Sequence, residues 1–302
     1  MTPGETNAGA ERRRGFMNSH GLHETGDEPY FYSNYTWKEL RDLTAQRRVV
    51  LLPVGTTEDH GHHLPLDTDN FLVWSVCVEA AKRIPNEVLV MPLIPYGYNI
   101  HHIDFPGTIC VAAEHFINFV ADICKSIAYH GFKRILIVDG HGSNVPLLDV
   151  AARRVVLETD ALCGSFIYTN LIKDVCRKIR ESAHPGGMAH ACELETSLFL
   201  YLAERRVRKS EIRKEINLPP SKYIFLDLVD GSPVQMMDWW TTFSKTGVVG
   251  DPTLATKEKG KAMFDAVIER MVELVRDFRD RPRGQREDMH AEKVVGDFGL
   301  KP

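Results

Sequence analysis

Long apolar runs, a cysteine framework and an excess of basic charge are all missing from this sequence. No stretch approaches the roughly 18 apolar residues of a membrane-spanning helix. The first 27 residues contain Arg12-Arg13-Arg14, but no apolar signal-peptide core follows them. The formal net charge of −4 gives no electrostatic reason to expect a polyanion as partner. We therefore expect no membrane span and no nucleic-acid partner.

The six cysteines are scattered along the chain without a CxxC pair. Most lie inside apolar runs, which favours buried free thiols in a reducing compartment over disulfides. Hydrophobic residues make up 43% of the chain and charged residues 26%, as in ordinary soluble proteins. The sequence therefore predicts a cytoplasmic protein, and 302 residues suit one large domain or two.

Apolar runs alternate with amphipathic stretches through the middle of the chain. The runs at 48–55, 88–94, 134–139 and 164–169 are typical of buried strands, whereas the stretches at 70–83, 113–129, 145–158, 170–179, 193–205 and 255–279 favour helices. Strands and helices in alternation predict an α/β fold, a mostly parallel sheet flanked by helices. We expect residues 1–27 to be a disordered arm, 28–280 the folded domain and 281–302 a charged mobile tail.

The first of three polar clusters follows the first expected strand. Glu58, His60 and Asp69 stand there with further carboxylates and imidazoles, and no thiolate is among them. Such a mixed oxygen and nitrogen set suits zinc, manganese or ferrous iron in a catalytic site. His62 and His63 are weaker candidates, because three histidines in four positions cannot all point inward.

The second cluster is Gly140-His141-Gly142-Ser143-Asn144, directly after the third expected strand. The carboxyl ends of parallel strands meet at one edge of a sheet, so His141 is expected to meet Glu58, His60 and Asp69 there. The two glycines also allow a phosphate loop, although the spacing and the lysine of a Walker motif are missing.

The third cluster, His190, Glu193 and Glu195, stands at the start of an expected helix. The spacing puts His190 and Glu193 on one helical face, with Glu195 pointing elsewhere. We expect Glu193 to stabilise the helix dipole and Glu195 to be available to the site. Other aromatic and basic residues fit core packing, a subunit contact or a pocket wall equally well: Tyr168, Arg177, Trp239 and Trp240. Residues 206–253 are expected to cover the site or to form an oligomer contact.

Together the three clusters resemble the creatininase family of metal-dependent amidohydrolases. Val54 to Asp69 resembles its first motif, Gly140 to Asn144 its second and His190 to Thr196 its third. His102 with Phe105-Pro106-Gly107-Thr108, and Gly247 to Gly260, resemble further family segments. The resemblance spans about residues 30–280.

The resemblance implies a single three-layer α/β domain, usually in a homo-oligomer and often in a hexamer. It also implies two divalent ions, with zinc the first choice and manganese or iron the others, that hydrolyse a non-peptide C–N bond of a small cyclic or linear amide. By position, Glu58, Asp69 and His141 would hold one ion, and His60 and Asp69 the other. Creatininase has a further glutamate ligand at the position of Ser143, and Glu195 is expected to replace it.

The expected mechanism is attack by a metal-bound hydroxide. His190 is the candidate proton donor to the leaving nitrogen, and Glu195 is either a ligand or the base. Creatininase closes tryptophans over creatinine shortly before its third motif, whereas residues 160–190 here contain none. Creatinine is therefore not the expected substrate. A creatininase-like peptidase, a formamide hydrolase and a non-catalytic binding protein on the same fold are the alternatives.

Overall fold

Four parallel strands form the central sheet of the computed structural model, which describes residues 27–291. Their order is β2-β1-β3-β4. The strands are β1 (Val49–Val54), β2 (Val88–Val90), β3 (Arg134–Asp139) and β4 (Leu162–Ile167). The predicted parallel sheet is confirmed, but the run expected as a strand at 88–94 leaves the ladder after Val90. Pro92 lies just beyond and has no N–H to donate to a neighbouring strand.

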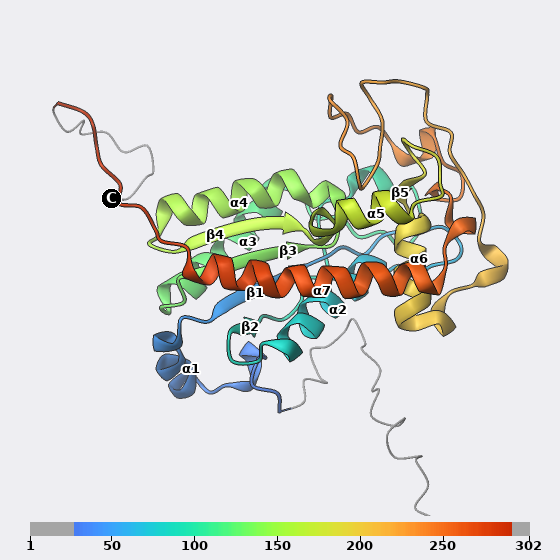
Figure 1. Ribbon diagram of the computed structural model, residues 1–302. Coiled ribbons are helices and arrows are strands. Elements are labelled where there is room, and N and C mark those ends of the chain that lie inside the picture. The colour runs from blue at the N-terminus through green and yellow to red at the C-terminus, as the bar shows by residue number, and fades with distance from the viewer. Residues whose placement is uncertain (1–26, 292–302) are drawn as a thin grey trace, which may run out of the picture.

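Helices cover both faces of this sheet. On one face lie α2 (Thr68–Arg83) and α7 (Lys257–Asp280), and on the other α3 (Ala113–Tyr129) and α4 (Val145–Glu158). Side chains alternate along β1, so Leu51 packs with α2 and α7 while Leu52 packs with α3 and α4. Figure 1 shows α4 and α7 on opposite sides of β3 and β4. The result is the expected three-layer, single-domain α/β arrangement.

Smaller elements gather beyond the carboxyl ends of the strands. They are α5 (Lys173–Ile179), β5 (Met188–His190), α6 (Glu193–Ala203) and β6 (Val249–Gly250), and β5 pairs with β6 antiparallel. Residues 206–253 connect α6 to this pair, mostly without regular structure. At the far end, α1 (Trp37–Leu43) begins with the capping box that Thr36 and Glu39 predict. Figure 1 shows α6, β5 and the 206–253 segment at one end of the molecule.

The two expected terminal segments lie largely outside the described residues. Residues 1–26 and 292–302 are not described, so the disordered arm and half of the charged tail stay predictions. The first part of the tail contacts the domain, because Arg283 donates hydrogen bonds to the backbone oxygens of Val156, Thr159 and Ala161. Within residues 27–291, no helix has both the length and the apolar character to cross a bilayer.

An ion pair between Glu193 and Lys259 joins α6 to α7. Glu193 is fully buried, accepts hydrogen bonds from the backbone N–H groups of Glu181 and Ser182, and lies 2.5 Å from Lys259 Nζ. Burial raises the pKa of Glu193, but Lys259 and Ser182 outweigh this, so the pKa lies below 4.5. This carboxylate stabilises the fold above its unfolded pKa, and the contribution is lost as pH falls through the lower folded pKa.

Lys259→Met is therefore expected to lower the free energy of unfolding by about 2 kcal/mol at pH 7, because a buried charge loses its partner. The loss should shrink when the pH falls far enough to protonate Glu193. Urea unfolding at pH 7 and at a series of lower pH values measures both effects. Lys261→Met is the matched control, since the Lys261 side chain is 60% exposed in its pair with Asp265. Equal losses for the two variants would contradict the prediction.

Candidate metal centre

The five side chains that the sequence singled out as metal ligands meet at the carboxyl edge of the sheet. They are Glu58 and His60 from the loop after β1, Asp69 from the first turn of α2, His141 from directly after β3, and Glu195 from α6. Every one of them is buried, with Glu58 and His60 wholly inaccessible to solvent. The adjacent ends of β1 and β3 bring the first two clusters together, as the parallel topology predicts.

Asp69 lies between two groups of these side chains. Its Oδ2 is 3.3 Å from His141 Nδ1, which is itself 3.1 Å from Glu58 Oε1. Its Oδ1 is 3.2 Å from His60 Nε2, which is 3.8 Å from Glu195 Oε1. One carboxylate thus offers a separate oxygen to each of two imidazoles.

The donor atoms fit divalent cations by spacing and by chemistry. Zinc bonds of about 2.1 Å place the ligands of a tetrahedral site about 3.4 Å apart, close to the separations in both groups. Among the described residues, both carboxylate oxygens of Glu58, Oδ2 of Asp69 and Nε2 of His60 are buried without a hydrogen-bond partner. Buried polar atoms are normally paired, so this cluster of orphan acceptors and ring nitrogens favours a cation that completes them.

The pKa values of Asp69 and His60 are both shifted by the other side chains of the candidate metal centre. Burial raises the pKa of Asp69, but His60 and His141 outweigh this and hold that pKa below its usual range. Burial lowers the pKa of His60, but Asp69 and Glu195 outweigh it and raise the pKa well above its ordinary value. The carboxylates therefore stabilise positive charge at the ring, which is the charge a cation would supply.

Backbone contacts orient the first-cluster histidines. His60 Nδ1 lies 3.4 Å from the backbone oxygen of Glu58 and donates its proton there, so Nε2, which faces Asp69, is the ring nitrogen available to a metal ion. His63 is also buried, but its Nε2 contacts the hydroxyl of Thr196 at 2.9 Å. His62 is exposed. As expected, the three histidines do not all face the site.

The start of α6 differs from the expected geometry. His190 belongs to β5, so helical spacing does not relate it to Glu193, and the expectation that those two share a helical face was wrong. Ala191 has a φ of 48° in the turn between β5 and α6. Beyond the turn, Glu193 contacts Lys259, whereas Glu195 comes within ligand distance of His60 and His190. Its other oxygen accepts from Cys192 N–H at 3.3 Å, which fixes the rotamer.

Sequence reasoning gave no role to Asp59, which anchors two imidazoles at the site. Its Oδ1 is 2.7 Å from His102 Nδ1, and its backbone oxygen is 2.8 Å from His190 Nε2. Because a carbonyl oxygen only accepts, His190 carries its proton on Nε2 and presents Nδ1, 3.7 Å from Glu58 Oε1. Burial and Glu58 raise the pKa of Asp59 to about 8. Burial and His190 lower the pKa of His102.

Trp240 covers these histidines from the 206–253 segment. Its ring stacks on His102 at a centroid distance of 4.3 Å, and its Nε1 donates to the backbone oxygen of Gly247. Gly247 has a φ of 92°, and a Cβ there would lie 2.1 Å from Asp59 Oδ2, so only glycine permits this close approach. The expectation that this segment covers the site agrees with these contacts.

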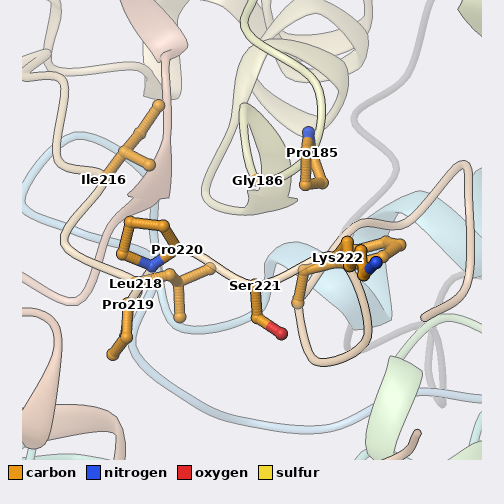
Figure 2. Close-up of a pocket in the computed structure, with 9 residues that line it drawn as sticks. Pro185, Gly186, Ile216, Leu218, Pro219, Pro220, Ser221 and Lys222 are labelled. Atoms are coloured by element: carbon orange, nitrogen blue, oxygen red, sulfur yellow. The ribbon is translucent and has the colours of Figure 1, made fainter. Parts of the chain in front are cut away.

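A cavity of about 970 Å³ opens onto the site. Asp69, His141, His190 and Glu195 line it, and Tyr168, Trp239 and Trp240 contribute to its wall. Arg177 lies outside the lining and pairs with Asp230. Ser143, where creatininase has a glutamate, contacts His101 Nε2 at 3.1 Å. Figure 2 shows a different hollow, which Pro185, Pro219 and Pro220 help to line. Its volume is about 570 Å³, and no candidate ligand lines it.

The family and the relatives that this sequence matches agree with the candidate metal centre described above. The sequence matches the creatininase family, described as creatinine amidohydrolase, over residues 33–275. It is 27% identical to 3-dehydro-scyllo-inosose hydrolase of Thermotoga maritima, covering 84% of this chain and 86% of that protein. It is 31% identical to the mycofactocin precursor peptide peptidase of Mycobacterium tuberculosis, covering 78% and 87%.

Two solved creatininase structures, a manganese form and a zinc–zinc form of a mutant, each superpose with a TM-score of 0.71. Each is 26% identical in sequence, and each match covers 83% of this chain and 99% of the other. The family match spans most of the described chain, and the fold is that of creatininase. The chain therefore belongs to the creatininase family.

Proposed function

We propose that this chain hydrolyses a non-peptide C–N bond of a small amide with two divalent cations. Glu58, Asp69 and His141 would hold one ion, and His60, Asp69 and Glu195 the other. The observation that carries the proposal is Asp69, whose two oxygens face two separate imidazoles at 3.2 and 3.3 Å. When bound, the ions would polarise the amide carbonyl and lower the pKa of water. The ligand set suits zinc first, and manganese or iron as well.

His190 is the residue we assign to proton transfer. Its Nε2 proton is held by the backbone oxygen of Asp59, so the ring cannot turn without breaking that bond. Its Nδ1 faces the carboxylate of Glu58, and the residue lines the cavity. Nδ1 can accept a proton from the attacking water and pass it to the leaving nitrogen, as a general base and then a general acid.

A peptide is the second candidate substrate. The 31% identity to a mycofactocin precursor peptide peptidase favours it, and so does a cavity of about 970 Å³, at the upper end of the range of about 300–1,000 Å³ found for ligand pockets. Both candidates use the same metal ligands. They differ in the length of substrate that the cavity receives.

Amine release from a lactam, a formamide, a linear acetamide and a short peptide tests the proposal. We expect turnover of at least one non-peptide amide by protein loaded with zinc or manganese, loss of it after dialysis against a chelator, and recovery when the ion is restored. Cleavage of the peptide alone would select the second candidate. Protein that binds no ion and cleaves none of the four would be a binding protein on the same fold, and the proposal would fail.

A further inference from the structure

The cavity changes character between its floor and its mouth. The floor is lined by Asp69, His141 and Glu195 of the candidate metal centre, with His190 beside them and Trp240 stacked on His102. Five large apolar side chains that line the cavity are more than a third exposed to solvent: Ile100, Val145, Met236, Met237 and Trp239. Met236, Met237 and Trp239 come from one segment, whereas Ile100 and Val145 come from the loop after β2 and the start of α4. Apolar side chains from three separate segments of the chain thus gather at the exposed part of the lining, which we call the mouth.

Exposed apolar groups gathered around a cavity mark a binding surface more often than single exposed residues do. The side chain of Met236 is 57% exposed and that of Trp239 is 49% exposed, although Trp240, which follows Trp239, is buried. Methionine side chains adapt to apolar groups of different shapes, and tryptophan presents a large flat face. A ligand that fills the mouth would therefore be apolar or aromatic where it contacts these residues.

The volume of the cavity also favours a ligand that reaches the mouth. A small cyclic amide that reaches the floor would leave most of about 970 Å³ unfilled. A substrate whose C–N bond lies beside Asp69 and His190 must extend outward past Trp240 to fill the rest. Its outer portion then contacts the exposed apolar side chains of the lining, among them Val145, Met237 and Trp239.

We propose that the mouth formed by Ile100, Val145, Met236, Met237 and Trp239 is a subsite for an apolar or aromatic substituent of a linear amide. This assignment rests on the proposed function for the position of the scissile bond. It names the class of substrate, a linear amide with a bulky apolar group on the side that faces solvent.

The test compares N-acetyl-L-phenylalanine amide with N-acetylglycine amide, which differ only in the benzyl group. For the metal-loaded protein we expect kcat/KM, measured by ammonia release, to be at least about tenfold higher for the phenylalanine compound, equivalent to about 1.4 kcal/mol. Met237→Ala combined with Trp239→Ala should remove this preference by raising KM for the phenylalanine compound toward the value for the glycine compound. Trp37→Ala, which removes a tryptophan that is 77% exposed on α1, should preserve the preference.

Calorimetric binding of both compounds separates failure of the subsite from failure of the proposed function. Tighter binding of the phenylalanine compound, lost in the double variant, supports the subsite even if neither amide is cleaved. Equal binding and equal cleavage of the two compounds would overturn the subsite while hydrolysis stands. If the double variant dissociates an oligomer in sedimentation without changing the preference, the mouth is a contact between copies of the chain, and the subsite is wrong.

Discussion

Asp69→Ala is expected to reduce bound metal from about two ions per chain to less than one and to abolish turnover. The two oxygens of Asp69 lie 3.2 Å from His60 Nε2 and 3.3 Å from His141 Nδ1, so its loss removes an oxygen from each group. Metal charge contributes several kcal/mol to stabilising the transition state of amide hydrolysis. We therefore expect kcat/KM to fall by at least about a thousandfold. Elemental analysis of protein purified without chelator gives the ion count directly.

Asp67→Ala is the matched control. Asp67 precedes the same helix by one residue, carries the same charge and pairs with Arg206. This variant should keep both ions and its turnover, although the helix start loses a stabilising contact. If Asp69→Ala kept two ions and full activity, Asp69 would not bridge the groups, and the binuclear centre would have to be abandoned.

The parts of this centre that come directly after strands could be predicted from the sequence. A continuous apolar run marks a buried parallel strand, and the residues immediately after that strand lie at the carboxyl edge of the sheet. Glu58 and His60 come soon after β1 and His141 directly after β3, and β1 and β3 are neighbours. Predicting that they meet therefore needed only the positions of the strands, which hydrophobic patterning indicates, and a parallel sheet.

The turn from β5 into α6 could not be predicted in the same way. Met188–His190 is a three-residue strand, too short to leave a periodic pattern, and its partner β6 is about 60 residues away in the sequence. Treating His190 as helical placed it on one face with Glu193, although Glu195 was still expected to be available to the site. The pairing of β5 with β6, and the positive φ of Ala191, separate His190 from the helix that carries Glu193 and Glu195.

Asp59 and Trp240 act through contacts that no local pattern encodes. The carboxylate of Asp59 reaches His102, 43 residues further along the chain, and Trp240 comes from a segment almost without regular structure. Asp59 stands among many polar residues, and its spacing from them gave no reason to assign it a role. A tryptophan pair beside turn-forming residues fits a core, an interface or a pocket wall equally well, and tertiary contacts alone assign Trp240 to the last.

Glu195→Gln is expected to reduce the ion count from about two to about one and to lower kcat/KM by at least about a hundredfold, since one ion's share of several kcal/mol is lost. Glutamine has nearly the same shape, and its amide oxygen can still accept the hydrogen bond from Cys192 N–H. Its NH2 group would then face His60, and an amide nitrogen that donates hydrogen bonds is no metal ligand. The fold should therefore persist while the second group loses an oxygen. Elemental analysis and circular dichroism of the same preparation measure both effects.

The His190→Ala variant tests whether His190 is a metal ligand or transfers protons. His190 lies within 4.8 Å of the ligand atoms of His60 and Glu195, yet its Nε2 is held by the Asp59 backbone. If His190 transfers protons, its alanine variant keeps two ions and loses turnover, whereas Glu195→Gln loses an ion as well. Two ions in both variants would make Glu195 the base and leave His60 and Asp69 to hold the second ion alone. One ion in the wild-type protein and in both variants would mean that only the group of Glu58, Asp69 and His141 binds metal, and the orphan Nε2 of His60 would need another partner.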